Sequence, residues 1–156
     1  MKTILVPIDF SAVSKRVVAA AEELARGLGG RLVVLHVVQP PVLTDSDFGT
    51  QLTAEYAEQA GQAAEKQLAR LRQQVQKDGL EITVRSTSGF PGQSILDAAK
   101  EVDADFIVLG SHGHGAFYDL IVGSTASRVI KRARCPVLIV PPQPEPAPRK
   151  ARARRR

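Results

Sequence analysis

Short apolar runs alternate with longer amphipathic segments along most of this chain, and this alternation constrains its fold more than any other feature. Residues 32–38 are apolar except at His36, and residues 106–109 form an apolar run that stops at Gly110. A strand that is apolar at every position is buried on both faces, as in parallel sheets covered by helices. The pattern therefore predicts a doubly wound α/β fold: a five-stranded parallel sheet with helices on both faces and right-handed crossovers.

The residues that interrupt this pattern set the boundaries of the elements. Gly29 and Gly30 end the first predicted helix, and Gly79 ends the second. Residues 42–53 fit either a loop or the frayed start of the second helix. The predicted strands are residues 3–6, 32–38, 80–87, 106–109 and 137–140, and the predicted helices are residues 14–28, 54–77, 93–102 and a segment that begins at Ser124.

Apolar spacing also predicts which helix faces are buried. Stripes at intervals of three and four residues run along the first two helices, and we expect both stripes to face the sheet. The stripe of the first helix is Val17, Ala21, Leu24 and Leu28. The stripe of the second helix begins with small residues, which predicts a close approach to the sheet at that end. Its members are Ala57, Ala60, Ala64, Leu68, Leu71 and Val75.

The net positive charge of the chain is concentrated in its last residues. Of 21 basic and 16 acidic residues, six basic and one acidic residue lie in residues 143–156, which leaves fifteen of each sign in residues 1–142. The last segment has three prolines and no apolar residue larger than alanine, so it cannot bury enough surface to fold. We therefore predict one folded domain at residues 1–142 and a disordered basic tail at residues 143–156. The tail is either a solubilising end or a weak contact for nucleic acid or another polyanion.

The sequence lacks a membrane span, a signal peptide and a pair of cysteines, and these three absences indicate the cellular compartment of the protein. No apolar run reaches the roughly 18 residues of a membrane span, and Met1 leads into a predicted strand without the regions of a signal peptide. The single cysteine, Cys135, cannot form an internal disulfide, which agrees with a reducing compartment. The sequence therefore predicts a cytoplasmic protein.

Glycines at fixed spacing follow the fourth predicted strand. Gly110, Gly113 and Gly123 precede Ser124, where a helical pattern begins. Glycines let the backbone approach a ligand closely, and a helix N-terminus presents N–H groups with a partial positive charge. Ser124 can cap the helix or donate its hydroxyl to a phosphate oxygen. The loop therefore predicts an anion site whose ligand is a phosphate ester.

The spacing of this loop excludes the two best-known phosphate loops. A P-loop needs a lysine before its Ser or Thr, and a dinucleotide fingerprint needs G-x-G-x-x-G; neither is present here. The spacing G-x2-G-x9-G-S/T fits without a gap. In this motif the chain resembles the universal stress protein family, in particular its ATP-binding branch. The P-x-D-x-S segment at residues 7–11 and the G-x-P turn at residues 89–91 extend the resemblance.

The resemblance implies the strand order 3-2-1-4-5, in which the loops after the first and fourth strands face one crevice. In this comparison Asp9 contacts the nucleoside, and the backbone of Val37 meets the edge of the adenine. The nucleotide site that the resemblance implies consists of Pro7, Ile8, Asp9, Val37, Leu109, Gly110, His112, Gly113, Gly123, Ser124 and Thr125.

Several of these residues also fit a role without a ligand. Asp9 can instead form a turn or cap the first helix. His112 and His114 can suggest a metal, but Zn²⁺ normally takes three or four protein ligands, so we expect no metal site made of side chains. The cations of the last helix fit either a nucleic-acid patch or the negative end of the helix dipole, which we favour. These cations are Arg128, Lys131, Arg132 and Arg134.

The predicted function is ATP binding by a regulatory stress-response protein that is not a fast enzyme. Because the loop contains no lysine, Mg²⁺ or Mn²⁺ is expected on the phosphates to offset their charge. Asp9 is the one carboxylate placed near the site, and no lysine or arginine finger is evident for phosphoryl transfer. Slow or partner-stimulated hydrolysis stays compatible with the sequence. ADP, AMP and cyclic nucleotides also stay open as ligands.

The last predicted strand bears on assembly. Members of the resembled family dimerise through this strand, which implies a homodimer through Val137, Leu138, Ile139 and Val140. An exposed apolar edge favours pairing, whereas Pro136 and Pro141 can blunt the strand and suit a monomer. Two rival functions remain: a dimeric interaction module without nucleotide, and polyanion binding through the tail.

Overall fold

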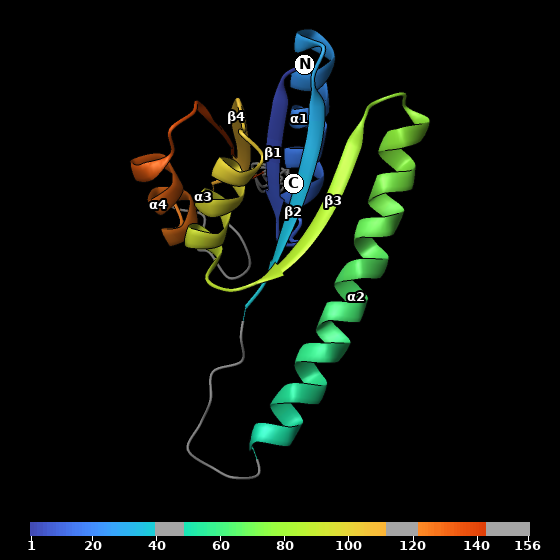
Figure 1. Ribbon diagram of the computed structural model, residues 1–156, viewed down its shortest axis with the longest axis vertical. Coiled ribbons are helices and arrows are strands. Elements are labelled where there is room, and N and C mark those ends of the chain that lie inside the picture. The colour runs from blue at the N-terminus through green and yellow to red at the C-terminus, as the bar shows by residue number, and fades with distance from the viewer. Residues whose placement is uncertain (40–48, 112–121, 143–156) are drawn as a thin grey trace, which may run out of the picture.

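The computed structural model describes residues 1–39, 49–111 and 122–142, and it confirms the predicted α/β fold (Figure 1). All five strands are parallel, in the order β3-β2-β1-β4-β5, as the resemblance implied. The strands are β1 (Thr3–Ile8), β2 (Arg31–Val38), β3 (Ile82–Ser88), β4 (Phe106–Gly110) and β5 (Val137–Val140). The helices are α1 (Ser14–Leu28), α2 (Gly49–Lys77), α3 (Pro91–Glu101) and α4 (Ser124–Arg132).

Helices cover both faces of the sheet, and each face has its own apolar core. Ile4 and Val6 of β1 pack with α1 and α2 on one face, whereas Leu5 packs with α3 and α4 on the other. Because successive side chains of a strand point to opposite faces, a central strand covered on both sides must be apolar throughout. Figure 1 shows α3 and α4 side by side and α2 along β3.

The first helix begins and ends where the sequence predicted. Gly29 adopts a left-handed conformation with φ of 61°, and its N–H donates to the carbonyl of Ala25, which ends α1. The predicted buried stripe holds at Val17 and Ala21. It is wrong at Leu28, which is 43% exposed, because the last turn of α1 packs through Ala25 instead.

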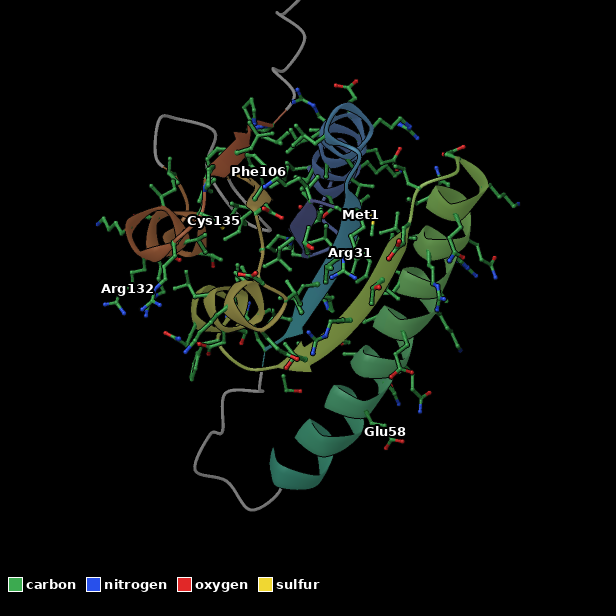
Figure 2. The ribbon with its side chains drawn as sticks, turned by 45° about the horizontal axis from the view of Figure 1, so that its top comes forward. Met1, Arg31, Glu58, Phe106, Arg132 and Cys135 are labelled. Atoms are coloured by element: carbon green, nitrogen blue, oxygen red, sulfur yellow. The ribbon has the colours of Figure 1, made fainter. Side chains whose placement is uncertain are left out.

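The second helix differs from its prediction in two ways. It begins at Gly49, so the part of residues 42–53 that the structure describes is helical, while residues 42–48 lie outside the described residues. The expected close approach at the start of the stripe is wrong at Ala60, which is exposed. The helix leans away from the sheet there, where Glu58 is also exposed (Figures 1 and 2), and it packs through Ala64, Leu68 and Val75 instead.

The start of α3 shows why its boundary was placed too late. The helix begins at Pro91, two residues before the predicted start. Proline has no N–H to lose in the first turn, and its fixed φ suits the first helical position. The G-x-P turn is therefore the entry to α3.

The turn between α1 and β2 leaves no room for a side chain. A Cβ added at Gly30 would lie 2.8 Å from the backbone oxygen of Lys2, which also accepts a hydrogen bond from Arg31 N. We expect Gly30→Ala to lower the free energy of unfolding by about 1–3 kcal/mol, as overpacking does. Urea unfolding measures this. Gly27→Ala is the matched control: its Cβ meets nothing within 4 Å, and alanine in a helix should stabilise by about 0.5–1 kcal/mol. Equal stability of the Gly30→Ala variant and the wild type would contradict the close contact.

Asp105 joins the amino ends of β1 and β4. Its carboxylate accepts hydrogen bonds from Lys2 Nζ at 2.7 Å and from the N–H of Thr3 at 2.8 Å. The bond from Lys2, followed by the bond from Thr3, lowers the pKa of Asp105. A carboxyl whose pKa is lower in the folded state stabilises the protein above its unfolded pKa of about 3.9.

The stabilising effect of Asp105 should therefore depend on pH. We expect the wild type to be more stable than Asp105→Asn at pH 7. This difference should shrink as pH falls from about 5 through the lowered pKa of Asp105, because protonation removes its charge. Denaturant unfolding of both proteins at several pH values measures it. A stability difference that stays constant down to pH 2 would show that the charge of Asp105 contributes nothing.

Candidate functional site

The strands β1 and β4 stop pairing before their carboxyl ends. β1 pairs with β2 along its whole length, from Thr3 to Ile8, but it pairs with β4 only at Ile4 and Leu5. In the order 3-2-1-4-5 the chain reverses its direction of winding between these two strands, and ligands of open α/β sheets bind at such a position.

Pro7 explains where the pairing stops. The N–H of Asp105 donates to the carbonyl of Thr3, so the odd-numbered residues of β1 direct their backbone groups toward β4. Pro7 is one of these residues, and it has no N–H to donate. The first strand was predicted to end at residue 6, whereas the structure extends β1 through Pro7 and Ile8 because β2 still pairs with them.

A cavity of about 120 Å³ lies at this split. It is reached by the carboxyl ends of β1, β2 and β4 and by the first turns of α1, α3 and α4. Its described lining residues are Pro7, Ile8, Asp9, Ser11, Val13, Ser14, Val17, Leu35, Val37, Gln39, Pro91, Ile95, Leu109, Gly110, Ser111, Gly123 and Thr125.

Asp9 organises the turn between β1 and α1. Its Oδ1 accepts a hydrogen bond from the N–H of Ser11 at 2.9 Å and one from the hydroxyl of Ser14 at 3.1 Å. The predicted turn-forming role is therefore correct. The capping role is wrong, because the N-cap residue of α1 is Val13 and no side chain caps it. The turn holds the carboxylate of Asp9 at the wall of the cavity.

The start of α4 forms another wall. Gly123 is its N-cap residue, and no side chain caps the helix, so the capping role predicted for Ser124 is wrong. The N–H of Gly123 donates to the carbonyl of Ser111 at 2.8 Å, and the N–H of Ser111 donates to Val140. These bonds tie the start of α4 to the end of β4. The first N–H groups of a helix have no partner within the helix, and Thr125, in the first turn of α4, brings such a donor to the cavity.

The structure brings most of the implied site residues together. Ser124 is exposed and does not belong to the described lining, while His112 and Gly113 lie outside the described residues, as does His114. The residues that line the cavity as implied are Pro7, Ile8, Asp9, Val37, Leu109, Gly110, Gly123 and Thr125.

Sequence reasoning missed about half of the lining. Leu35 and Gln39 lie two residues to either side of Val37, and alternation along the strand would have placed them on the same face. Pro91 and Ile95 come from α3, whose first turn reaches the cavity only through tertiary packing. Ser11 and Ser14 line the cavity as well, from the turn after β1 and the first residue of α1.

The cations predicted for the last helix stand apart from this cavity, and one of them, Arg134, follows the end of α4 at Arg132. None of them belongs to its described lining, and Arg132 points away from the sheet (Figure 2). The stem of Arg128 crosses the first turn of α3, where a Cβ at Gly92 would lie 2.5 Å from Arg128 Cδ. Their charge therefore acts on the cavity only at longer range.

The described residues contain neither a cluster of metal ligands nor a membrane-spanning helix. Within residues 1–39, 49–111 and 122–142, no group of three or more His, Cys, Asp or Glu side chains is arranged to hold a metal ion. In the same part of the chain, no helix combines the length and the apolar character that crossing a membrane would require.

Known proteins with similar sequences and structures agree on the family. A family model described as the universal stress protein family matches residues 1–141. A universal stress protein of Thermus aquaticus is 35% identical over 140 residues, which covers 89% of this chain and 98% of the relative. The solved UspA of Lactobacillus plantarum is 26% identical with a TM-score of 0.81, and the match covers 89% of this chain and 97% of that one.

A further solved structure is a complex with a nucleotide. The universal stress protein of Archaeoglobus fulgidus in complex with dAMP is 28% identical with a TM-score of 0.55, and the match covers 89% of this chain and 96% of that one. Both the sequence match over residues 1–141 and the shared fold point to one family. The chain belongs to the universal stress protein family.

Proposed function

We propose that this chain binds an adenine nucleotide, with ATP as the favoured ligand, in the cavity between the carboxyl ends of β1 and β4. In this proposal it is a regulatory, cytoplasmic stress-response protein and not a fast enzyme. One observation carries the proposal: the Asp9 turn and the start of α4, which lie far apart in sequence, line the same cavity. The dAMP complex of the Archaeoglobus fulgidus relative supports it.

The two ends of the cavity suit the two ends of a nucleotide. Val37, backed by the buried Leu35 and Ile95, offers apolar surface to a base, whereas Thr125 offers a helix N-terminal N–H group to phosphate. Asp9 lies on the turn after β1, where its carboxylate can accept hydrogen bonds from ribose hydroxyls. We assign the missing part of the phosphate site to His112 and Gly113 by resemblance.

The backbone of Val37 suits the edge of an adenine. Arg31 N donates to the carbonyl of Lys2, so the odd-numbered residues of β2 direct their backbone groups toward β1. The last pair between β1 and β2 joins Ile8 to His36, and β1 ends there. The carbonyl of Val37, one residue further along β2, therefore points beyond the end of β1. It can accept a hydrogen bond from the 6-amino group of adenine.

A divalent cation fits this site as a partner of the phosphates. The described lining contains no lysine or arginine to offset triphosphate charge. The described residues also offer no side-chain cluster for a resident metal. Mg²⁺ commonly binds through phosphate oxygens and waters with few protein ligands, so we assign Mg²⁺ or Mn²⁺ to the phosphates.

We also propose a homodimer through β5. Ile107 N donates to the carbonyl of Pro136, and Ser111 N donates to that of Val140, so the backbone groups of Val137 and Ile139 face away from β4. Leu138 is 43% exposed on this edge. Unpaired backbone groups on an apolar edge strand favour pairing with a second copy.

Isothermal titration of the folded, nucleotide-stripped protein with ATP, with and without Mg²⁺, tests the proposed function. We expect micromolar or tighter binding that weakens without the metal. AMP in the same assay separates the contribution of the base and ribose from that of the further phosphates. Absence of binding by every adenine nucleotide would refute the proposal and favour the dimeric interaction module.

A further inference from the structure

We propose that the side chain of Gln39 selects adenine, by hydrogen-bonding the edge of the base that carries N6 and N7. This inference rests on the proposed adenine-nucleotide site and adds a residue that determines its specificity. Gln39 follows β2 directly, and it belongs to the lining of the cavity.

The position of Gln39 continues an apolar row. Leu35, Val37 and Gln39 all line the cavity, and their spacing of two residues places them on one face of the extended chain. Leu35 and Val37 belong to the core between the sheet and α3, so this row faces Ile95. Leu35 is buried, so Val37 is the apolar member of this row that a base can contact, and the row ends in the exposed amide of Gln39.

The backbone next to Gln39 is held in place. β2 and β3 remain paired up to Val38 and Ser88, and the N–H of Gly89 donates to the carbonyl of Val38 at 3.0 Å. The same turn leads into Pro91, which also lines the cavity. An amide that discriminates between bases needs such a fixed attachment, because a mobile one would adapt to any base.

The chemistry of an amide matches adenine. Gln carries one donor group and one acceptor, and it pairs with the 6-amino group and N7 of adenine through two parallel hydrogen bonds. The 6-amino group has two hydrogens, so one can bond the carbonyl of Val37 and the other Oε1 of Gln39. A 6-oxo purine has no amino group at this position and would leave both acceptors without a donor. In the described lining, Gln39 is the one side chain with an amide.

A combination of a protein variant and a modified nucleotide tests this pairing. The ligand 7-deaza-ATP lacks the N7 acceptor, so the wild type should bind it about tenfold more weakly than ATP. In Gln39→Leu this difference should disappear, and the preference for ATP over ITP should fall about tenfold. The matched control is Gln93→Leu, because Gln93 is an exposed amide on α3 that donates to Asp97 and lies outside the described lining. It should behave as the wild type does.

The outcomes separate this inference from the function on which it rests. If the wild type binds no adenine nucleotide, the proposed function fails and the role of Gln39 fails with it. If the wild type binds ATP but Gln39→Leu weakens ATP and 7-deaza-ATP equally, or changes neither, the proposed function stands and the role of Gln39 is overturned. Circular dichroism of each variant, measured in parallel, excludes unfolding as the cause.

Discussion

Leu5→Ala is expected to lower the free energy of unfolding by about 2–5 kcal/mol, the range for removing a fully buried leucine side chain. Leu5 is 0% exposed and lies in the middle of the central strand. It pairs with Val33 on one side and with Ile107 on the other, and it packs in the core under α3 and α4. The strands beside Leu5 and the helices that cover it can relax only in part, so the substitution leaves a cavity.

Chemical denaturation followed by circular dichroism measures this loss. The control is Leu28→Ala, which removes the same atoms from a leucine that is 43% exposed at the end of α1. This control should lower the free energy of unfolding by less than about 1 kcal/mol, since little apolar surface is removed from the protein interior. If both variants lost the same stability, the two-sided core around β1 would not be the main source of stability in this fold.

Asp9→Asn is expected to weaken nucleotide binding about tenfold to hundredfold while leaving the protein folded. A hydrogen bond to a charged group contributes about 1.5–3 kcal/mol, and the substitution removes the charge that would accept ribose hydroxyls. Asparagine keeps an oxygen that can accept from the N–H of Ser11 and the hydroxyl of Ser14, and it is well suited to such a turn. Calorimetric titration with ATP measures the change in affinity.

Ser14→Ala separates the two roles of Asp9. It removes the hydroxyl that donates to Asp9 but keeps the carboxylate. If Asp9 contacts the ligand, this variant should bind ATP much more tightly than Asp9→Asn does. If Asp9 only shapes the turn, the two variants should have similar affinities, and the contact with the nucleoside would have to be abandoned.

The alternation of apolar and amphipathic segments was sufficient to predict the fold class. Strands that are buried on both faces need apolar residues at every position, so β1, β2 and β4 are visible in the sequence without any partner. Residue type alone also placed the ends of α1, because Gly29 adopts the left-handed conformation that ends a helix. The start of α2 and the exposure of Leu28 and Ala60 were not predictable in this way. They depend on how far the core extends, which is a property of the assembled layers.

The candidate site likewise has features that local sequence predicts and features that depend on tertiary packing. Local patterns were enough to predict that Asp9 follows a strand and that a glycine-rich loop leads into α4, because turn residues and apolar runs involve only neighbouring residues. The position of both segments on one cavity, with Pro91, Ile95 and Gln39 in its wall, depends on how the sheet and helices pack together. The physical reason is that strand order is set by packing between segments far apart in the chain. No local preference can encode which two carboxyl ends will separate and leave room for a ligand.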